Sequence, residues 1–201
     1  APVRELASIQ HDVRVEHARE LLGKRYKKSP VKHAENHEAL EKTIFGIIKN
    51  HLPKKFAKSA HEITDAIIVE ATKHGLDPLF VMALIAGESS FNPEARGPVG
   101  EIGLMQIRPA TGAWMAQKLN TKWRGDNSLK DPLTNIKLGT AYIAWLREKF
   151  QGQGQLYLAA YNMGPGNVKS ALSRNVRPKD YPIHVMKRYL AFYKDVNRHG
   201  L

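Results

Sequence analysis

The sequence contains no cysteine among its 201 residues. That absence excludes disulfide bridges, thiolate metal sites, iron–sulfur clusters and cysteine nucleophiles. The sequence also lacks any uninterrupted apolar stretch close to the roughly 20 residues that a membrane-spanning helix needs. It begins at Ala1, with neither a methionine nor a basic-then-apolar leader. We therefore expect that a signal peptide has been removed or was never present.

Basic residues are in clear excess. Lys and Arg number 31 against 19 Asp and Glu, which gives a formal net charge of +12. Such a charge favours an anionic partner, which includes nucleic acid, a membrane surface and a cell-wall polymer. No motif that reads nucleic acid accompanies the charge, so we expect no nucleic-acid partner.

The apolar residues follow a helical period throughout, which predicts an all-α protein. Residues 1–58 are expected to form a basic helical arm. Within the arm, apolar spacing indicates one helix over residues 6–21, ended by Gly23, and another over residues 40–48. The lysine-rich residues 24–32 are expected to connect the two helices. The sequence leaves open whether this arm packs on the rest of the chain or contacts cell wall.

Residues 59–201 are expected to form the main domain, where the helix boundaries carry stronger signals. Ser59 and Glu62 match a capping box, and Gly75 follows the helix that they open. Asp77-Pro78 and Asp131-Pro132 each combine an N-cap aspartate with a proline at the first helical position. Two further helices are expected over residues 155–162 and 180–196, and an ordered loop over residues 91–108.

One glutamate lies on an apolar helix face. In the helix that Asp77 opens, Val81, Leu84 and Ile85 share a face with Glu88, at spacings of i, i+3, i+4 and i+7. A carboxyl group on a buried face is unusual. Desolvation there raises its pKa and keeps it protonated near neutral pH, as a general acid requires. The alternative is a glutamate in water at a frayed helix end.

Three segments carry a resemblance to a known family. They are Glu88-Ser-Ser-Phe-Asn-Pro-Glu-Ala95, Gly100-Glu-Ile-Gly-Leu-Met-Gln-Ile-Arg-Pro-Ala-Thr111 and Ala159-Ala-Tyr-Asn-Met-Gly-Pro-Gly166. In this order the segments resemble the soluble lytic transglycosylases of glycoside hydrolase family 23, which share a lysozyme-like helical fold with goose-type lysozymes. The resemblance covers roughly residues 60–195. It implies cleavage of the β-1,4 bond between N-acetylmuramic acid and N-acetylglucosamine in peptidoglycan, without a cofactor.

The resemblance also implies roles for individual residues. Glu88 is the expected catalytic residue, acting first as an acid and then as a base, and many members of the family release a 1,6-anhydro sugar. Tyr161 is the second expected catalytic residue, facing Glu88 across a cleft. The expected substrate contacts are Gly97, Glu101, Met105, Gln106, Asn162 and Tyr181. For Tyr161 and Met105 the alternative is packing in the core.

Three positions depart from the family pattern. Tyr181 matches a tyrosine that follows an acidic-Thr-Arg sequence in many relatives, whereas this chain has Arg177-Pro-Lys179 there. Many relatives have serine where this chain has Gly97, near the N-acetyl group of the sugar, and often alanine at the position of Glu101. The loop thus loses a hydroxyl and gains a carboxylate. We interpret this either as loop drift or as altered recognition that favours deacetylated glycan, whose ammonium a carboxylate can bind.

Other readings of the chain remain open at this stage. His33 and His37 have a spacing that suits zinc, but no third ligand is evident, so we expect no metal site. The enzyme is expected to be a monomer in the periplasm or outside the cell. Surface contact of the basic arm with cell wall is one of the two alternatives that the sequence leaves open for the arm. The alternative functions are a catalytically inactive wall-binding module and, with less support, a basic nucleic-acid-binding protein.

Overall fold

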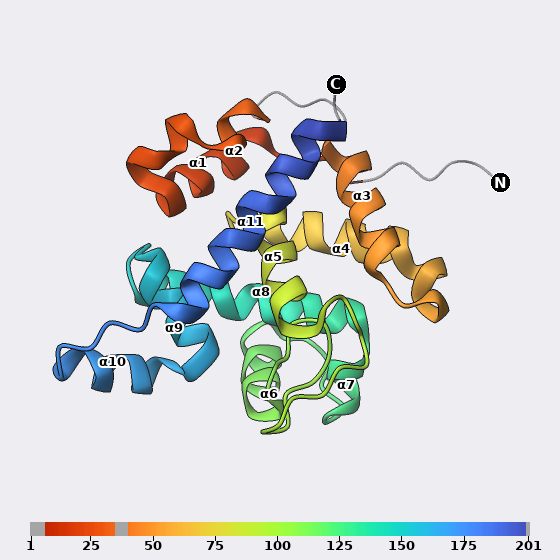
Figure 1. Cartoon of the computed structure of the whole chain (residues 1–201). Coiled ribbons are helices and arrows are strands. Elements are labelled where there is room, and N and C mark those ends of the chain that lie inside the picture. The colour runs from red at the N-terminus through yellow and green to blue at the C-terminus, as the bar shows by residue number, and fades with distance from the viewer. Residues whose placement is uncertain (1–6, 35–39, 200–201) are drawn as a thin grey trace.

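The computed structural model describes residues 7–34 and 40–199, and in this part of the chain the regular structure is helical, with only isolated β-bridges (Figure 1). The prediction of an all-α fold is confirmed. The helices in chain order are α1 (His11–Leu22), η1 (Gly23–Lys28), α2 (Pro30–His33), α3 (Leu40–His51), η2 (Lys54–Ser59), α4 (Ala60–Lys73), α5 (Pro78–Ser89), α6 (Pro109–Lys118), α7 (Asn127–Lys130), α8 (Pro132–Lys149), α9 (Gly154–Met163), α10 (Pro165–Ser173) and α11 (Asp180–His199).

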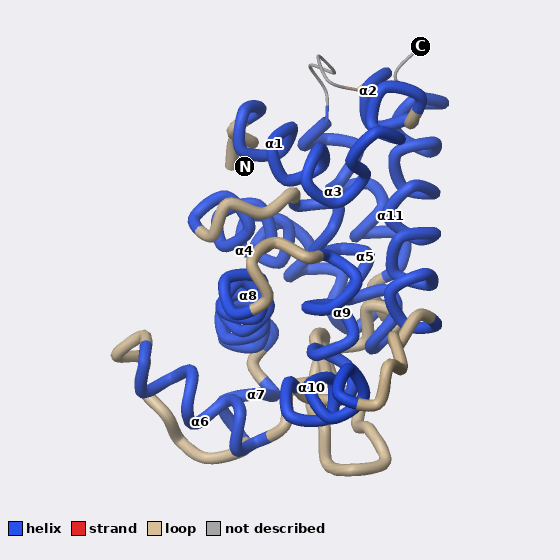
Figure 2. The backbone as a smooth tube through the Cα atoms, turned by 90° about the vertical axis from the view of Figure 1, so that its left-hand side faces the viewer, coloured by secondary structure: helices blue, strands red, loops and turns tan. Residues whose placement is uncertain are grey.

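Helix α5 lies at the centre of the molecule. Its first eight residues are all buried. The long helix α11 packs along α5, and α4 contacts α5, α8 and α3. Figure 2 shows α6 and α7 below α8, separate from the upper helices α1 to α3. Because α5 is apolar around its whole circumference, it forms the axis of the core, and its carboxyl end is the part that reaches toward the lower helices.

Two aspartate caps and one glycine stop form as the sequence predicts. The carboxylate of Asp77 accepts a hydrogen bond from Leu79 N at 2.9 Å, and that of Asp131 from Thr134 N at 2.8 Å. Gly75 has φ +67°, and its N–H donates to Thr72 O at 3.1 Å. Only glycine adopts this left-handed conformation without strain, so Gly75 ends α4 and turns the chain into α5.

The capping box predicted at Ser59 is wrong. Ser59 has φ −90° and ψ 2°, and its side chain makes no capping hydrogen bond. The residue is the last of η2, which runs directly into α4, so its backbone lacks the extended conformation that an N-cap needs. The residues expected to form a connector, 24–32, are also different from the prediction, because they lie mostly in the short helices η1 and α2.

The expected arm packs against the rest of the chain. The buried apolar residues of α1 and α3, including Leu22, Ile44 and Ile48, belong to the same continuous cluster as those of α5. Arg147 of α8 also forms an ion pair with Glu20 of α1, at 2.6 Å. The division into an arm of residues 1–58 and a domain of residues 59–201 stays a prediction.

A buried polar network joins three of these helices. The carboxylate of Asp77, at the start of α5, accepts hydrogen bonds from the hydroxyls of Tyr189 and Tyr193 of α11, each at 2.6 Å. Arg14 of α1 donates to the Tyr193 hydroxyl at 2.8 Å and to Ala34 O at 3.2 Å. All four polar side chains are fully buried. Tyr193 therefore links the guanidinium of Arg14 to the carboxylate of Asp77.

His17 adds a second link between α1 and α5. Burial lowers the pKa of His17 well below its ordinary value, with the charge of Arg147 acting in the same direction. The neutral imidazole accepts a hydrogen bond from Asp77 N at its Nδ1, 3.0 Å away. Its Nε2–H is then the donor to the Tyr157 hydroxyl of α9, at 3.2 Å. The start of α5 is thus held by α1, α9 and α11 together.

The two tyrosines provide a matched test of this network. We expect Tyr193→Phe to lower the free energy of unfolding by about 3 kcal/mol, because it removes both a hydrogen bond to a buried carboxylate and the link to Arg14. Tyr189→Phe removes only a bond to Asp77 and should cost about 1.5 kcal/mol. Urea unfolding of both variants measures the difference, and equal losses would contradict the linking role of Tyr193.

Candidate active site

Glu88 occupies the last turn of α5, where the buried helix reaches the surface. Its side chain is partly buried, and the hydroxyl of Tyr181, from the start of α11, donates a hydrogen bond to its carboxyl group. Burial raises the pKa of Glu88, and the charge of Glu101 adds to this effect. The Tyr181 hydrogen bond and the guanidinium of Arg188 oppose it, but the pKa stays above its ordinary value. The raised pKa is the condition expected of a general acid.

The chain turns sharply after Glu88. Ser89 Oγ lies 2.8 Å from Leu104 O and 3.1 Å from Ile85 O, so one hydroxyl ties the helix end to the following loop. Ser90 and Phe91 both have positive φ, at 50° and 62°, which is uncommon for residues with a side chain. The ring of Phe91 is buried and anchors this turn. The structure therefore fixes the backbone immediately after Glu88.

Asn135 of α8, which the sequence analysis missed, holds the loop over residues 91–108. Its amide donates to Ile102 O at 2.8 Å and to Leu129 O at 2.9 Å, and its oxygen accepts from Met105 N at 2.8 Å. The side chain is fully buried, so these bonds satisfy its amide inside the protein. The signal in the sequence that could have indicated this role is a polar residue within the apolar pattern of α8.

The side chain of Met105 does not make the sugar contact that the sequence predicts. Its side chain is fully buried and packs against Gly139 of α8, where an added Cβ would come within 2.6 Å of the sulfur. The thioether therefore belongs to the core and does not line the cleft. The backbone carbonyl of Met105 instead accepts a hydrogen bond from the Tyr161 hydroxyl, at 2.8 Å. Tyr161 thus fastens α9 to the loop, and its hydroxyl is not bonded to Glu88.

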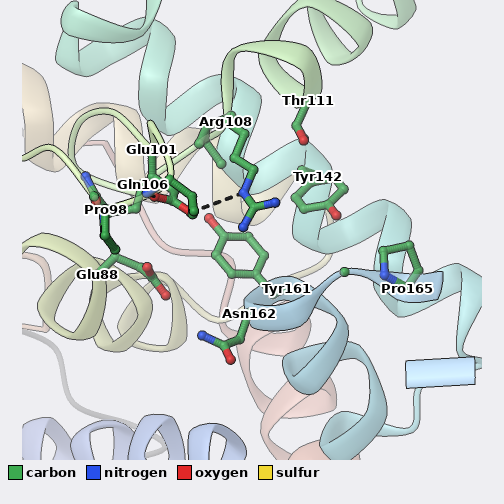
Figure 3. Close-up of a pocket in the computed structure, with 14 residues that line it drawn as sticks. Glu88, Pro98, Glu101, Gln106, Arg108, Thr111, Tyr142, Tyr161, Asn162 and Pro165 are labelled. Atoms are coloured by element: carbon green, nitrogen blue, oxygen red, sulfur yellow. Dashed lines mark hydrogen bonds and ion pairs between the residues drawn. The ribbon is translucent and has the colours of Figure 1, made fainter. Parts of the chain in front are cut away.

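A cleft of about 590 Å³ opens beside Glu88 (Figure 3). Of the catalytic and substrate-binding residues predicted from the sequence, all except Met105 and Tyr181 line the cleft. Tyr181 instead donates a hydrogen bond to the carboxyl group of Glu88, which does line it. Figure 3 shows Tyr161 and Asn162 of α9 across the cleft from Glu88. The remaining lining residues are Pro98, Val99, Ile107, Arg108, Thr111, Tyr142, Gly164 and Pro165.

The carboxylate of Glu101 fills the space above Gly97. A Cβ atom at position 97 would overlap Glu101 Oε2 and would lie 2.8 Å from Gln106 Oε1. Glu101 accepts hydrogen bonds from Val99 N and from Arg108 Nε, each at 3.1 Å. Burial alone would raise the pKa of Glu101, but backbone N–H groups and the Arg108 guanidinium together lower it. The cleft therefore holds a charged carboxylate, and Gly97 leaves room for it.

Arg188 of α11 also acts on Glu88, and its positive charge lowers the pKa of that carboxyl group. A Cβ atom added at Gly87 would lie 3.1 Å from its Nη1, so this guanidinium, like the Glu101 carboxylate, rests on a glycine. Neither Arg108 nor Arg188 was predicted from the sequence, because nothing in the local pattern distinguishes them from other surface cations.

The described residues hold no group of three or more histidine, aspartate or glutamate side chains that could bind a metal ion. His37, one of the pair considered for zinc, lies outside them. Of the helices described, none is both long and apolar enough to span a membrane.

The arrangement defines a class of protein: a helical, lysozyme-like domain whose open cleft holds Glu88, with a raised pKa, and the charged carboxylate of Glu101. Residues 65–183 match the family model of the transglycosylase SLT domain. The chain is 31% identical over 139 residues to the soluble lytic murein transglycosylase of Salmonella typhimurium, covering 68% of this chain and 21% of that protein. It is also 31% identical over 138 residues to the membrane-bound lytic murein transglycosylase C of Sodalis glossinidius, covering 64% and 38%.

Solved structures agree on the fold. The lytic transglycosylase Slt of Pseudomonas aeruginosa, solved as an inactive glutamate-to-glutamine mutant, matches with a TM-score of 0.61 and 21% identity, over 96% of this chain and 38% of that one. The 70 kDa soluble lytic transglycosylase of Escherichia coli matches with a TM-score of 0.54 and 23% identity, over 90% and 31%. The chain belongs to the SLT transglycosylase domain family, and it spans about a fifth of the soluble relative's length.

The contact between Tyr181 and Glu88 leads to a direct test. Because the hydroxyl stabilises the ionised carboxylate, Tyr181→Phe should raise the pKa of Glu88 above its value in the unmodified chain. The carboxyl carbon of Glu88 can be titrated by NMR in both proteins. Tyr161→Phe is the matched control, since that hydroxyl donates to Met105 O, and it should move the Glu88 titration less. An unchanged or lowered pKa in Tyr181→Phe would contradict the assigned contact.

Proposed function

We propose that this chain cleaves the β-1,4 bond between N-acetylmuramic acid and N-acetylglucosamine in the glycan strands of peptidoglycan. The observation that carries the proposal is Glu88, a carboxyl group with a raised pKa at the cleft end of the buried helix α5. The substrate would place the activity in the periplasm or outside the cell. Family membership supports the reaction class, and the inactive glutamate-to-glutamine mutant of the Pseudomonas relative supports dependence on a single acidic side chain.

In the proposed reaction Glu88 acts twice. As the protonated acid it donates its proton to the glycosidic oxygen, and the bond from that oxygen to the muramic acid C1 breaks. The resulting carboxylate then takes a proton from the hydroxyl that attacks C1. If the attacking group is the sugar's own 6-hydroxyl, the product is a 1,6-anhydro sugar; if it is water, the product has a reducing end, as with a muramidase. In both cases Glu88 ends protonated again.

Two tyrosines support Glu88 in different ways. Tyr181 bonds to the carboxyl group directly and favours its ionised form, which Glu88 adopts between the two steps. Tyr161 donates a hydrogen bond to Met105 O, which leaves its own oxygen available to accept a hydrogen bond from a sugar hydroxyl. Gln106 and Asn162 provide further polar groups along the same cleft.

We also propose that the loop favours glycan in which some amino sugars are deacetylated. The charged carboxylate of Glu101 lies at the cleft, in the space that a side chain at position 97 would take. A primary ammonium on the sugar would form an ion pair with it, whereas an acetamide N–H would donate only a hydrogen bond from an uncharged group. Arg108 donates to one carboxylate oxygen and Val99 N to the other, and each oxygen has two lone pairs, so the carboxylate keeps acceptor capacity.

Two rival functions predict different observations. An inactive wall-binding module would bind sacculi without releasing fragments. A nucleic-acid-binding protein would hold oligonucleotides in moderate salt, whereas a glycosidase of charge +12 should associate with them only weakly and lose them as salt rises. The raised pKa of Glu88 in an open cleft favours the enzyme, because neither rival uses a protonated carboxyl group there.

Replacement of Glu88 tests the central residue. Glu88→Gln should reduce release of soluble fragments from purified sacculi by on the order of 10²–10⁴-fold, because the amide keeps the shape but cannot donate the proton. The matched control is Glu94→Gln, which removes an exposed carboxylate paired with Lys55, outside the cleft. Activity of Glu88→Gln within a few-fold of the Glu94 control would refute the assignment.

Gly97 and Glu101 should behave as a coupled pair. Gly97→Ser alone should destabilise the protein by roughly 1–3 kcal/mol, because the new side chain overlaps the Glu101 carboxylate. Adding Glu101→Ala removes the overlap with the carboxylate and should recover part of that loss, since the close approach to Gln106 remains. Gly97→Ala separates the effect of volume from that of the hydroxyl. Additive unfolding free energies would contradict the close packing of the two residues.

The same variants test the proposed preference. The unmodified chain should digest partly deacetylated sacculi ten- to a hundred-fold faster than acetylated sacculi, as expected for one charge-assisted hydrogen bond of roughly 1.5–3 kcal/mol. Glu101→Ala, alone or with Gly97→Ser, should remove most of the difference. If the unmodified chain digests acetylated sacculi equally well, the loop does not select deacetylated glycan.

A further inference from the structure

Three aromatic side chains lie together where the cleft ends: Trp114 of α6, and Tyr142 and Trp145 of α8. The ring centroids of Trp114 and Trp145 are 4.7 Å apart at an interplanar angle of 83°. Tyr142 and Trp145 are nearly parallel, at 15° and 6.0 Å. Tyr142 also lines the cleft and lies 5.6 Å from the ring of Tyr161. The aromatic group is therefore continuous with the candidate active site.

The positions of the two tryptophans follow from helix geometry. Figure 3 shows Glu88 at one end of the cleft, and Thr111 and Tyr142 at the other. Trp114 follows Thr111 by three residues on α6, and Trp145 follows Tyr142 by three residues on α8. Residues three apart share a helix face, so each tryptophan continues a cleft wall by one turn. Two walls of the cleft are thus extended by aromatic rings in the direction away from Glu88.

The rings are accessible and carry positive charge at their faces. All three aromatic side chains are only partly buried. The ammonium of Lys118 lies 5.4 Å from the ring centroid of Trp114, and that of Lys149 lies 4.7 Å from that of Trp145. Both lysines are exposed, so a ligand can displace their side chains from the rings at little cost. The group therefore combines partly exposed aromatic rings with exposed ammonium groups that can donate hydrogen bonds.

This combination matches a sugar ring in a polymer. A pyranose presents C–H groups on its faces, which pack on aromatic rings, and hydroxyls at its edge, to which an ammonium donates. The stem peptides of peptidoglycan add carboxylates that lysine binds more strongly. We propose that Trp114, Tyr142 and Trp145, with Lys118 and Lys149, form a binding subsite for sugars of the same glycan strand beyond the cleft. This inference rests on the proposed function, since it takes peptidoglycan as the substrate.

The test measures binding, so that it does not depend on turnover. In a Glu88→Gln background, dissociation constants are compared for long peptide-free glycan strands and for a peptidoglycan-derived tetrasaccharide. The background protein should prefer the long strands, and Trp145→Ala should reduce this preference about tenfold, the effect expected of one aromatic anchor. Trp123→Ala is the matched control, because Trp123 packs over Gly112, and it should leave the preference in place.

Two further variants guard against a folding defect. Trp145→Phe retains an aromatic ring in the core contact and should lose only part of the preference. Lys118→Gln with Lys149→Gln changes only exposed side chains and should weaken binding of strands that keep their stem peptides several-fold more than binding of peptide-free strands.

The subsite is overturned if the Trp145 variants keep the preference for long strands, as the Trp123 control does, and the lysine replacements affect the binding of strands with and without stem peptides equally. It is also overturned if the background protein shows no preference for long strands. Failure of the proposed function would have a different signature, namely no release of glycan fragments from sacculi by the unmodified chain, which the binding comparison does not depend on.

Discussion

The hydrogen bonds from Tyr189 and Tyr193 to the buried carboxylate of Asp77 set the position on which the candidate active site depends. Asp77 opens α5 and Glu88 lies near its other end, about 16 Å away at 1.5 Å per residue. Tyr189 lies at the middle of α11 and Tyr193 in its carboxyl-terminal half, and Tyr181 lies at its start. The helices are therefore antiparallel, and one contact at each end fixes their register: Asp77 with the tyrosine pair, and Glu88 with Tyr181. Arg14 and His17 extend this constraint to α1, which explains how residues far from the cleft can support its geometry.

Charge around Glu88 is arranged by two glycines. Gly97 leaves space for the carboxylate of Glu101, which raises the pKa of Glu88, and Gly87 leaves space for the guanidinium of Arg188, which lowers it. Burial of Glu88 outweighs the Tyr181 hydrogen bond and the Arg188 charge, so its pKa is raised overall. In each case the charged group can lie where it does because the glycine has no side chain to occupy that space. A substitution at either glycine would therefore act on the electrostatics of Glu88 through a second residue.

Local signals in the sequence predicted the helices that have strong stops or caps, and tertiary contacts determined the rest. Asp77, Asp131 and Gly75 act through neighbouring backbone groups, so their roles could be predicted. The capping box at Ser59 failed because the preceding turn continues into α4. Helices α6 and α10 were not predicted: each begins at a proline, but their apolar residues give no clear period. At the site, motif order indicated Glu88 and Tyr161. The burial of Met105, the part played by Asn135 and the overlap of Glu101 with Gly97 depend on residues distant in sequence or on side-chain packing.

The most direct test of the account is the mass of the fragments that the unmodified chain releases from purified sacculi. Cleavage by Glu88 predicts muropeptides that end at the muramic acid C1, with either an anhydro or a reducing terminus, because the acid protonates the oxygen of that bond. The two termini differ by one water, so the same spectrum identifies the attacking group. Sacculi that release no such fragments, or release only free peptides, would contradict the assignment of this cleft to glycan cleavage.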